Sequence, residues 1–442
     1  MKKPIVAALL VLLPALAQAY PLDGYEYTGI RRLEYYRLAR EGEIPGPRWP
    51  KGAYLGMAEV YPRWKQNDGS TLPPPDAEFG RKLAAMLESG SRGLYGVAVL
   101  DLSDPANPRY GGHNAAMQAN IGSVGKVLVG LAIFHQLALI YPKDIAARER
   151  VLRDSRIVAD AFSQYDHHGI VLFDVEKRRK LSRSMRIGET GNLFEYLDWM
   201  LSASSNSAAA MVQKELIALA HFRQRYPVSE EEKARFFKTT PRAELGRIMQ
   251  TAQYSAITAA GLDVNKIRQS SFFTRGGNQA VAASGGSWAT PEQLVRYLYK
   301  LEAGTLIDTW SSRELKRLLY MTQRRIRYAS HPALHESAVY FKSGSFFQCH
   351  GGPSGCRKYM GDKTNRLASV AIIESPAGSP SLLYMVAVMS NVLRVNSAVA
   401  HQTLALRIQR LIESMHPEVA PPAKPLPYVP VGAPAAPVDG AD

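Results

Sequence analysis

The chain has 442 residues, of which 46% are hydrophobic and 21% charged, enough for one large domain or two with a sizeable buried core. Its 54 lysines and arginines exceed its 39 acidic residues, which gives a formal net charge of +15. This charge favours anionic envelope polymers or an acidic substrate as partners, although solubility alone would also explain it. No nucleic-acid recognition motif accompanies the charge, so we do not expect nucleic acid as a partner.

The first 19 residues have the pattern of a cleaved secretory signal. Lys2 and Lys3 form a charged start, residues 5–16 an apolar centre, and Ala17-Gln18-Ala19 a small-x-small cleavage site. The apolar stretch is too short to span a bilayer. We therefore expect an exported, soluble mature protein without a membrane span, located in the periplasm if the organism is Gram-negative.

Two terminal segments differ in composition from the rest of the chain. Residues 20–75 are rich in Tyr, Pro, Gly and Arg without a sustained period, and we interpret them as an N-terminal extension and linker with one helix over 30–40. Its tyrosines could form a sugar-stacking surface, but packing on the main domain is the simpler interpretation. Residues 416–442 carry a proline every few residues and predict a disordered or polyproline tail.

Between these segments, residues 76–415 show strands at both ends and helices in the middle. The expected strands are 94–102 with a second strand after a turn, then 338–343, 367–374 and 382–390. Helices are expected over 76–87 and 397–415, and residues 123–302 are mostly helical in pattern. Clustered strands favour an α+β fold over βαβ units. We predict an antiparallel sheet built from both ends and flanked by helices, plus a mostly helical lobe, with a cleft between them.

A serine is followed three residues later by a lysine only at Ser123-Val124-Gly125-Lys126. The apolar run after it, to Ile140, predicts a buried helix, so Ser123 and Lys126 would share a face at its N-terminus. A hydroxyl beside an amine in the field of a helix end is easier to deprotonate. Alone, the pattern also fits a solvated helix face.

Ser204-Ser205-Asn206 lies between a helical segment that ends near residue 201 and another that begins near 207. These residue types are natural helix caps, which is one interpretation. In the functional interpretation, Ser204 relays a proton and Asn206 binds a substrate amide.

Lys342-Ser343-Gly344-Ser345 ends the strand expected over 338–343. Lys342 could be a solvated edge charge. In the functional interpretation, Lys342 and Ser343 bind a substrate carboxylate, and Gly344 lets another backbone approach. The backbone N–H groups of Ser345 and Ser123 would then form an oxyanion hole, worth about 3 kcal/mol per donor.

The three motifs, in this order and on these predicted elements, resemble those of the penicillin-recognising serine hydrolases. The resemblance is closest to the class A β-lactamase catalytic domain and covers residues 76–415. It implies that Ser123 is the nucleophile of an acyl-enzyme, Lys126 the base for acylation and Ser204 the proton shuttle. It implies substrates that carry an amide next to a carboxylate, namely D-alanyl-D-alanine peptides and β-lactams, and neither a metal nor a cofactor.

The sequence departs from class A β-lactamases at the residue that activates water for deacylation. That family has a Glu-x-x-x-Asn loop, but Thr274 stands where the glutamate would be if Asn278 matches the asparagine. Glu244 is a weaker substitute. Ser205 also replaces the family's aspartate in the second motif, and Asp166-His167-His168 falls in an insertion before it.

These departures favour a peptidoglycan enzyme of D,D-carboxypeptidase or endopeptidase type. A β-lactamase with a non-standard deacylation base, and a non-turnover domain that binds wall peptide or β-lactam, are the alternatives.

Other chemistries fit the sequence less well. A zinc site is not expected, because the histidines include no His-Glu-x-x-His. The nucleophile elbow Gly-x-Ser-x-Gly of Ser-His-Asp hydrolases is not present around Ser123, because Ile121 stands where its first glycine would be. Cys349 and Cys356, seven positions apart, suggest a disulfide that shapes a short loop, with two free thiols as the alternative.

Overall fold

The computed structural model describes residues 23–282, 285–320, 325–352 and 355–419. The predicted signal at 1–19 and nearly all of the predicted tail at 416–442 lie outside the described residues. Within them, the central feature is a five-stranded antiparallel sheet in the order β2-β1-β11-β10-β9. Its strands are β1 (Tyr95–Asp101), β2 (Arg109–His113), β9 (Ala338–Gln348), β10 (Thr364–Ser375) and β11 (Leu382–Asn391). The sheet is built from both ends of the domain, so the predicted α+β fold is confirmed.

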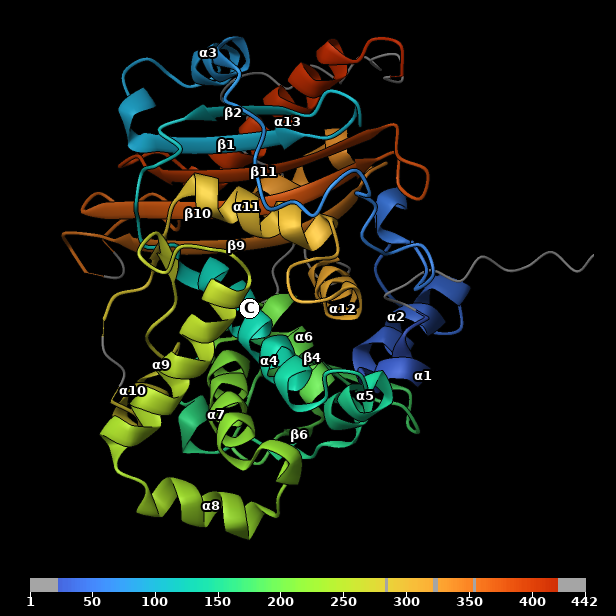
Figure 1. Cartoon of the computed structure of the whole chain (residues 1–442), viewed down its shortest axis with the longest axis vertical. Coiled ribbons are helices and arrows are strands. Elements are labelled where there is room, and N and C mark those ends of the chain that lie inside the picture. Colours follow the sequence, from blue (N-terminus) through green and yellow to red (C-terminus); the bar gives the residue numbers. More distant parts are fainter. Residues whose placement is uncertain (1–22, 283–284, 321–324, 353–354, 420–442) are drawn as a thin grey trace, which may run out of the picture.

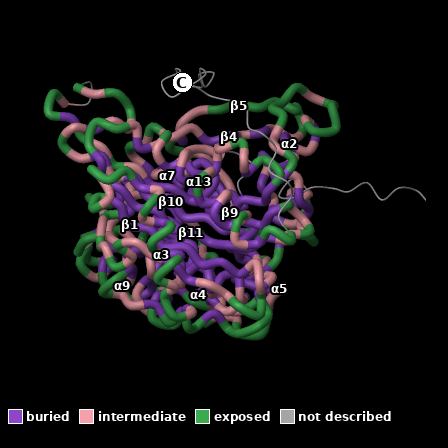
Figure 2. Tube along the Cα trace, turned by 90° about the horizontal axis from the view of Figure 1, so that it is seen from above, coloured by how far each residue is buried: buried purple, intermediate pink, exposed green. Residues whose placement is uncertain are grey.

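Helices cover both faces of the sheet, which is why its strands are apolar on both sides. Val97 and Val99 of β1 join the cluster under α3 (Ala77–Ala85) and α13 (Ser397–Met415). Ala98 and Leu100 alternate with them and join the cluster that contains α11 (Pro291–Glu302) and α12 (Thr309–Leu319). Figure 1 shows α3 and α13 above the sheet and α11 against it, and Figure 2 shows buried residues concentrated along β1, β9, β10 and β11.

The helical lobe lies below the sheet in Figure 1 and is organised around α4 (Lys126–Ile140). The other helices of the lobe are α5 (Ile145–Asp154), α6 (Leu193–Leu201), α7 (Asn206–Phe222), α8 (Glu230–Thr239), α9 (Arg242–Ala259) and α10 (Arg275–Ala280). Among the described residues, Gly122–Ile140 is the one helical stretch long and apolar enough to cross a membrane, and 83% of it is buried inside the protein. We therefore interpret this stretch as a core helix, which contacts α7 and α9.

Short strands in the lobe were not predicted. They are the hairpin β4 (Gly169–Asp174) and β5 (Arg179–Ser184), with the two-residue strands β3 (Ile157–Val158), β6 (Thr190–Gly191), β7 (Ile267–Arg268) and β8 (Trp288–Ala289). β5 has the sequence Arg-Lys-Leu-Ser-Arg-Ser, which lacks the apolar alternation that marks a strand, and its residues are mostly exposed.

The N-terminal segment forms α1 (Tyr25–Thr28) and α2 (Arg31–Glu41) and lies against the hairpin. Tyr35 and Tyr36 are buried in a cluster with Val171 and Phe173 of β4. These two tyrosines therefore pack inside the protein and are not part of a sugar-stacking surface.

Single turns of 3₁₀ helix complete the element order. They are η1 (Lys51–Ala53), η2 (Arg92–Leu94), η3 (Gly122–Gly125), η4 (Ala161–Ser163), η5 (Arg223–Arg225), η6 (Arg327–Ser330) and η7 (Pro332–Leu334).

Candidate active site

Ser123 lies on the 3₁₀ turn η3, immediately before α4 begins at Lys126. The sequence had placed it on the first turn of the α-helix itself. The tighter turn still brings the two side chains together, because residues three apart lie on the same side of a 3₁₀ helix. Lys126 Nζ is 3.1 Å from Ser123 Oγ.

The amine of Lys126 is enclosed by site residues. Its side chain is fully buried, and Nζ donates to the backbone oxygen of Ser204 at 2.5 Å and to Asn206 Oδ1 at 2.7 Å. With Ser123 Oγ, these acceptors account for the three hydrogens of an ammonium group. Lys126 thereby connects the first motif to the second.

Burial lowers the pKa of Lys126 to about 7, although the charge of Asp166 acts in the opposite direction. Near neutral pH a substantial fraction of the amine is then uncharged. A neutral amine can donate to Ser204 and Asn206 and still accept the Ser123 proton on its lone pair. This is the property required of a base that activates a serine.

Within Ser204-Ser205-Asn206, the capping interpretation holds for Ser205, whereas Ser204 contacts another site residue. Ser205 is the N-cap of α7, since its side chain accepts from Ala208 N. Ser204 has a positive φ of 61°, and its Oγ accepts from Lys342 Nζ at 2.8 Å. The structure thus places Ser204 between Lys126 and Lys342.

Lys342 and Ser343 belong to β9, the edge strand nearest η3. Lys342 is not a solvated edge charge: its residue is 3% exposed, and besides Ser204 it donates to the Ser343 backbone oxygen at 2.9 Å. Two buried amines and two serine hydroxyls therefore meet in one network across the sheet edge and the helical lobe.

Gly344 allows β9 to approach the turn that carries Ser123. A Cβ at Gly344 would lie 2.1 Å from the Ile121 oxygen and 2.5 Å from the Ser123 nitrogen. The Ser345 nitrogen lies close by, 3.5 Å from where a Cβ of Gly122 would stand. The two backbone nitrogens expected to form an oxyanion hole are thus on adjoining segments.

Arg327 is a site residue that the sequence analysis missed. Its guanidinium donates to Ser343 Oγ at 2.7 Å, to Ser345 Oγ at 3.0 Å and to Tyr359 Oη at 3.1 Å. Its φ of 53° places it in the left-handed region, which is uncommon outside glycine. No motif includes Arg327, and a lone arginine in a loop carries no sequence signal.

Asp166 is the second residue without an assigned role that the structure brings to the site. Its Oδ2 accepts from Ser205 Oγ at 2.9 Å and from the backbone nitrogens of Asn206 at 2.7 Å and Ser207 at 3.0 Å. An anion at these N–H groups is favoured by the positive end of α7. Asp166 therefore supplies a carboxylate next to Ser205, where the resembled class A β-lactamase motif has an aspartate.

The pKa of Asp166 reflects these contacts. Burial alone would raise it, but hydrogen bonds from His168 and from the Ser207 backbone hold it well below its usual value of 3.8. The carboxylate is accordingly ionised at neutral pH, and His168 Nδ1 lies 2.6 Å from Oδ1.

The loop that would carry a deacylating glutamate holds none in this structure. Thr274 is 3% exposed, caps α10 and donates to the Phe162 oxygen at 2.6 Å. The Asn278 amide bonds to the loop backbone at Phe272 and Thr274. The ring of Phe273, whose centroid is 4.9 Å from Lys126 Nζ, brings this loop to the site without a carboxylate.

The alternative candidate, Glu244, forms an ion pair with Arg247 on the surface of α9.

Asp166, His167 and His168 have ligand atoms within 4.8 Å of one another, as a metal site would require. Both Asp166 oxygens, however, already accept hydrogen bonds from protein donors. Oδ1 accepts from the backbone nitrogen and Nδ1 of His168, and Oδ2 accepts three hydrogen bonds from the start of α7. We therefore assign the carboxylate to the organisation of α7 and not to a metal.

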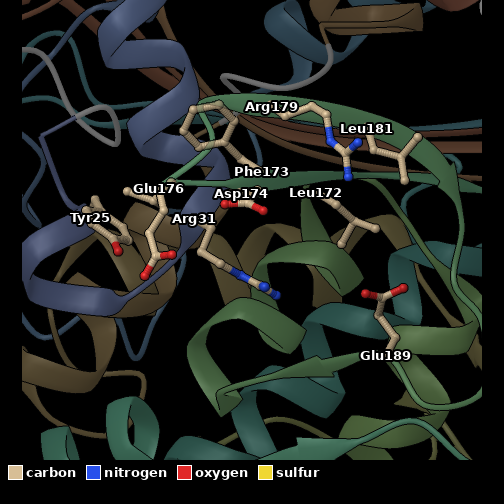
Figure 3. Close-up of a pocket in the computed structure, with 10 residues that line it drawn as sticks. Tyr25, Arg31, Leu172, Phe173, Asp174, Glu176, Arg179, Leu181 and Glu189 are labelled. Atoms are coloured by element: carbon tan, nitrogen blue, oxygen red, sulfur yellow. The ribbon is translucent and has the colours of Figure 1, made fainter.

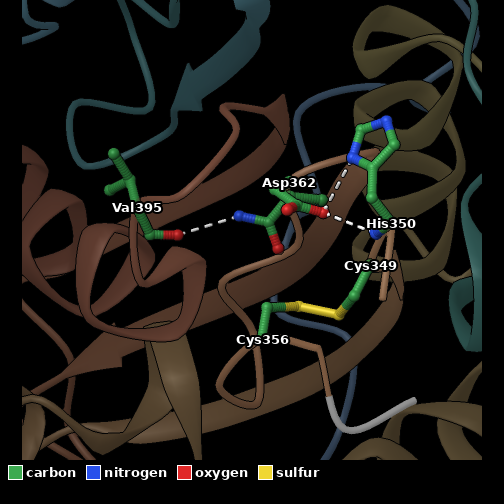
Figure 4. The surroundings of a disulfide bond; sticks show 6 residues. Cys349, His350, Cys356, Asp362 and Val395 are labelled. Carbon is green, nitrogen blue, oxygen red and sulfur yellow. Dashed lines mark hydrogen bonds and ion pairs between the residues drawn. A yellow bond between two sulfur atoms is a disulfide. The ribbon is translucent and has the colours of Figure 1, made fainter. Parts of the chain in front are cut away.

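Cys349 and Cys356 form a disulfide, with their Cα atoms 5.7 Å apart, directly after β9 (Figure 4). In the same loop, Asp362 Oδ1 accepts from the His350 backbone nitrogen at 2.9 Å and lies 3.2 Å from its Nδ1. The chain continues from this stapled loop to Tyr359, whose hydroxyl accepts a hydrogen bond from Arg327.

A separate cavity of about 450 Å³ lies between the N-terminal helices and the β4–β5 hairpin (Figure 3). No residue of the three motifs lines it. Arg31, which points into it, is already held by both oxygens of Glu195 and by the Thr190 oxygen. We assign this cavity no part in the chemistry.

No protein-family model matches the chain, and no curated protein matches it. Among solved structures, a beta-lactamase from Sphaerobacter thermophilus is similar over 77% of this chain and 97% of its own, with 16% identity and a TM-score of 0.49. A variant of the class A beta-lactamase of the last common ancestor of Gram-negative bacteria is similar over 77% and 100%, with 18% identity and a TM-score of 0.47. The structure of PBP-A is similar over 78% and 100%, with 12% identity and a TM-score of 0.46. All three are at most 18% identical to this chain and have TM-scores of 0.49 or less, so the proposal below depends on the site itself.

Proposed function

We propose that this protein is an exported serine hydrolase that forms an acyl-enzyme through Ser123. The observation that carries the proposal is the position of Lys126, whose buried amine contacts Ser123, Ser204 and Asn206 together. A serine beside an amine with a pKa of about 7 is activated for attack on an amide carbonyl. In this proposal Ser204, whose hydroxyl accepts a hydrogen bond from Lys342, passes the proton to the leaving nitrogen.

The charge at the β9 end of the site supports the proposed substrate class. Lys342 and Arg327 put two cations around Ser343, with the Arg327 guanidinium 2.7 Å from Ser343 Oγ. A guanidinium and a hydroxyl side by side bind a carboxylate well. An amide next to a carboxylate occurs in D-alanyl-D-alanine peptides and in β-lactams. We propose peptidoglycan peptides as the substrate, with a D,D-carboxypeptidase or endopeptidase reaction.

Two further parts of the proposal concern the cell. The signal-like start of the sequence supports export, and the net charge of +15 supports contacts with anionic envelope polymers. A β-lactamase with a different deacylating residue is the second candidate function, because the loop at Thr274 lacks the glutamate while the acylation residues are together.

The test is a pulse-chase with fluorescent penicillin on the purified mature protein and on Ser123→Ala. Label that persists for many minutes on the wild type alone would support a wall enzyme. Label lost within seconds, with penicilloate formed, would support the β-lactamase. Absence of label and of activity on D-alanyl-D-alanine peptides would contradict both.

A further inference from the structure

Asp166 and His168 form an oriented carboxylate–imidazole pair at the start of α7, next to Asn206, which contacts Lys126. His168 Nδ1 lies 2.6 Å from Asp166 Oδ1, and the His168 backbone nitrogen donates to the same oxygen at 3.1 Å. An ionised carboxylate can only accept, so the hydrogen of the neutral ring is on Nδ1 and the lone pair is on Nε2. The pair therefore presents a base at Nε2.

The pair is fixed to the site through the start of α7. The other oxygen of Asp166 accepts from the backbone nitrogen of Asn206 at 2.7 Å, and Asn206 Oδ1 accepts from Lys126 Nζ at 2.7 Å. His168 is thus linked by Asp166 to a residue that contacts the base of the first motif. The His168 side chain remains 20% exposed, which leaves it accessible to water.

The groups whose charges act on His168 are Asp166, Lys126 and His167. Burial, with the charges of Lys126 and His167, lowers the pKa of His168, while Asp166 opposes this; the net direction is downward from 6.5. The ring is therefore neutral, and able to accept a proton, at neutral pH.

We propose that His168, held by Asp166, is the general base that activates the water for release of the acyl group from Ser123. This inference rests on the proposed function and adds to it the residue that the Thr274 loop lacks. It assigns acylation to Lys126 and deacylation to a different group.

The step balances as a hydrolysis. His168 Nε2 takes a proton from water as the water oxygen bonds to the acyl carbon. The tetrahedral intermediate then breaks its bond to Ser123 Oγ, which takes a proton from the ammonium form of Lys126, and Lys126 takes one back from solvent. The product leaves as a carboxylic acid that ionises, and His168 returns its proton to solvent.

The test measures acylation and deacylation separately in wild type, His168→Gln and His167→Gln. The acyl donors are fluorescent penicillin and a thioester of N-acyl-D-alanine, whose thiol release reports acylation. His167→Gln is the matched control, since His167 is the adjacent ring stacked on His168 at 4.3 Å. We expect His168→Gln to acylate at the wild-type rate and to deacylate about 10²-fold more slowly, the usual contribution of a general base.

A pH profile separates catalysis from a structural role. Wild-type deacylation should fall at acid pH with an inflection below 6.5, and this limb should be absent in His168→Gln. Unchanged deacylation in His168→Gln, or retention of the acid limb, would overturn the inference and leave the proposed function intact. If His168→Gln were poorly folded, the wild-type profile alone would decide: release independent of pH from 4 to 8 would refute the proposal. Failure of the wild type to acylate at all would instead refute the proposed function.

Discussion

Arg32 of the N-terminal segment and Asp198 of α6 form a buried ion pair. Their side chains are 1% and 3% exposed, and Arg32 Nε and Nη2 bond to the two carboxylate oxygens. Ser202 closes the end of the same helix by donating to the Asp198 backbone oxygen at 2.7 Å. The N-terminal segment is therefore bonded to the helix that leads into the loop of Ser204.

Replacement of Arg32 by alanine should destabilise the protein strongly. It would leave the Asp198 carboxylate buried and unpaired, which costs about 3–5 kcal/mol in other proteins. Arg37→Ala, which removes two partly exposed ion pairs within α2, should change stability by less than about 1 kcal/mol. The measurement is urea unfolding followed by circular dichroism. Equal effects of the two substitutions would contradict a structural role for the N-terminal segment.

The rate of acylation should depend on the protonation of Lys126. Because only the neutral amine accepts the Ser123 proton, the acylation rate should rise with pH through an inflection near 7 and then level off. The measurement is single-turnover labelling by penicillin from pH 5 to 9. Lys126→Ala should lose acylation by at least about 10³-fold across this range. An inflection above pH 9 would mean that the amine is charged at neutral pH and is not the base.

The same pKa has a consequence for folding stability. The folded-state pKa of about 7 lies below the usual value of 10.5, so the unfolded chain binds more protons at this lysine between these two values. Lys126 should therefore make stability increase as the pH rises from 7 toward 10.5, and Lys126→Met should remove this contribution. Urea midpoints at pH 7 and pH 9 for both proteins measure it. An identical pH dependence in the variant would contradict the lowered pKa.

The close approach of β9 to η3 should make Gly344→Ala damaging. A methyl group there would overlap backbone atoms of Ile121 and Ser123, which cannot move without displacing the proposed nucleophile. We expect acylation to fall by about 10²-fold, comparable to the loss of one oxyanion donor. The control is Gly90→Ala, whose Cβ would meet nothing within 4 Å. Near-wild-type acylation by Gly344→Ala would exclude this tight contact from the mechanism.

The fold and the three motifs could be predicted because their signals are local. Strand alternation, the apolar run of α4, and short spacings such as Ser123 to Lys126 are all contained in a few neighbouring residues. Arg327 and Asp166 could not be found in this way, since each reaches the site from a loop and has no fixed spacing from a motif. The hairpin β4–β5 was missed because its outer strand is polar, and its stability comes from contacts with α2.

Asp166→Asn should shift the pH dependence of acylation and slow the release of the acyl group. The amide can still accept from the start of α7, but it removes the negative charge that raises the pKa of Lys126 and orients His168. We expect the pH inflection for acylation to move downward and deacylation to slow by about 10-fold or more. The measurement is the pair of pH profiles beside those of wild type. An unmoved acylation inflection would show that Asp166 and Lys126 are not coupled.

Arg327 should determine affinity for the substrate carboxylate. Its guanidinium bonds to Ser343 and Ser345 at the β9 end of the site, and the ring of Tyr359 lies 4.9 Å from it. We expect Arg327→Ala to reduce kcat/KM for a D-alanyl-D-alanine peptide by about 10- to 100-fold, mainly through KM, as loss of a charge-assisted hydrogen bond would. Arg327→Lys should recover only part of this, because lysine lacks the planar fork. The deciding control is a peptide whose terminal carboxylate is replaced by an amide. Wild type and Arg327→Ala should process this amide peptide at the same low rate. If the variant were slower than wild type on the amide peptide by the same factor as on the carboxylate peptide, Arg327 would only support the conformation of β9.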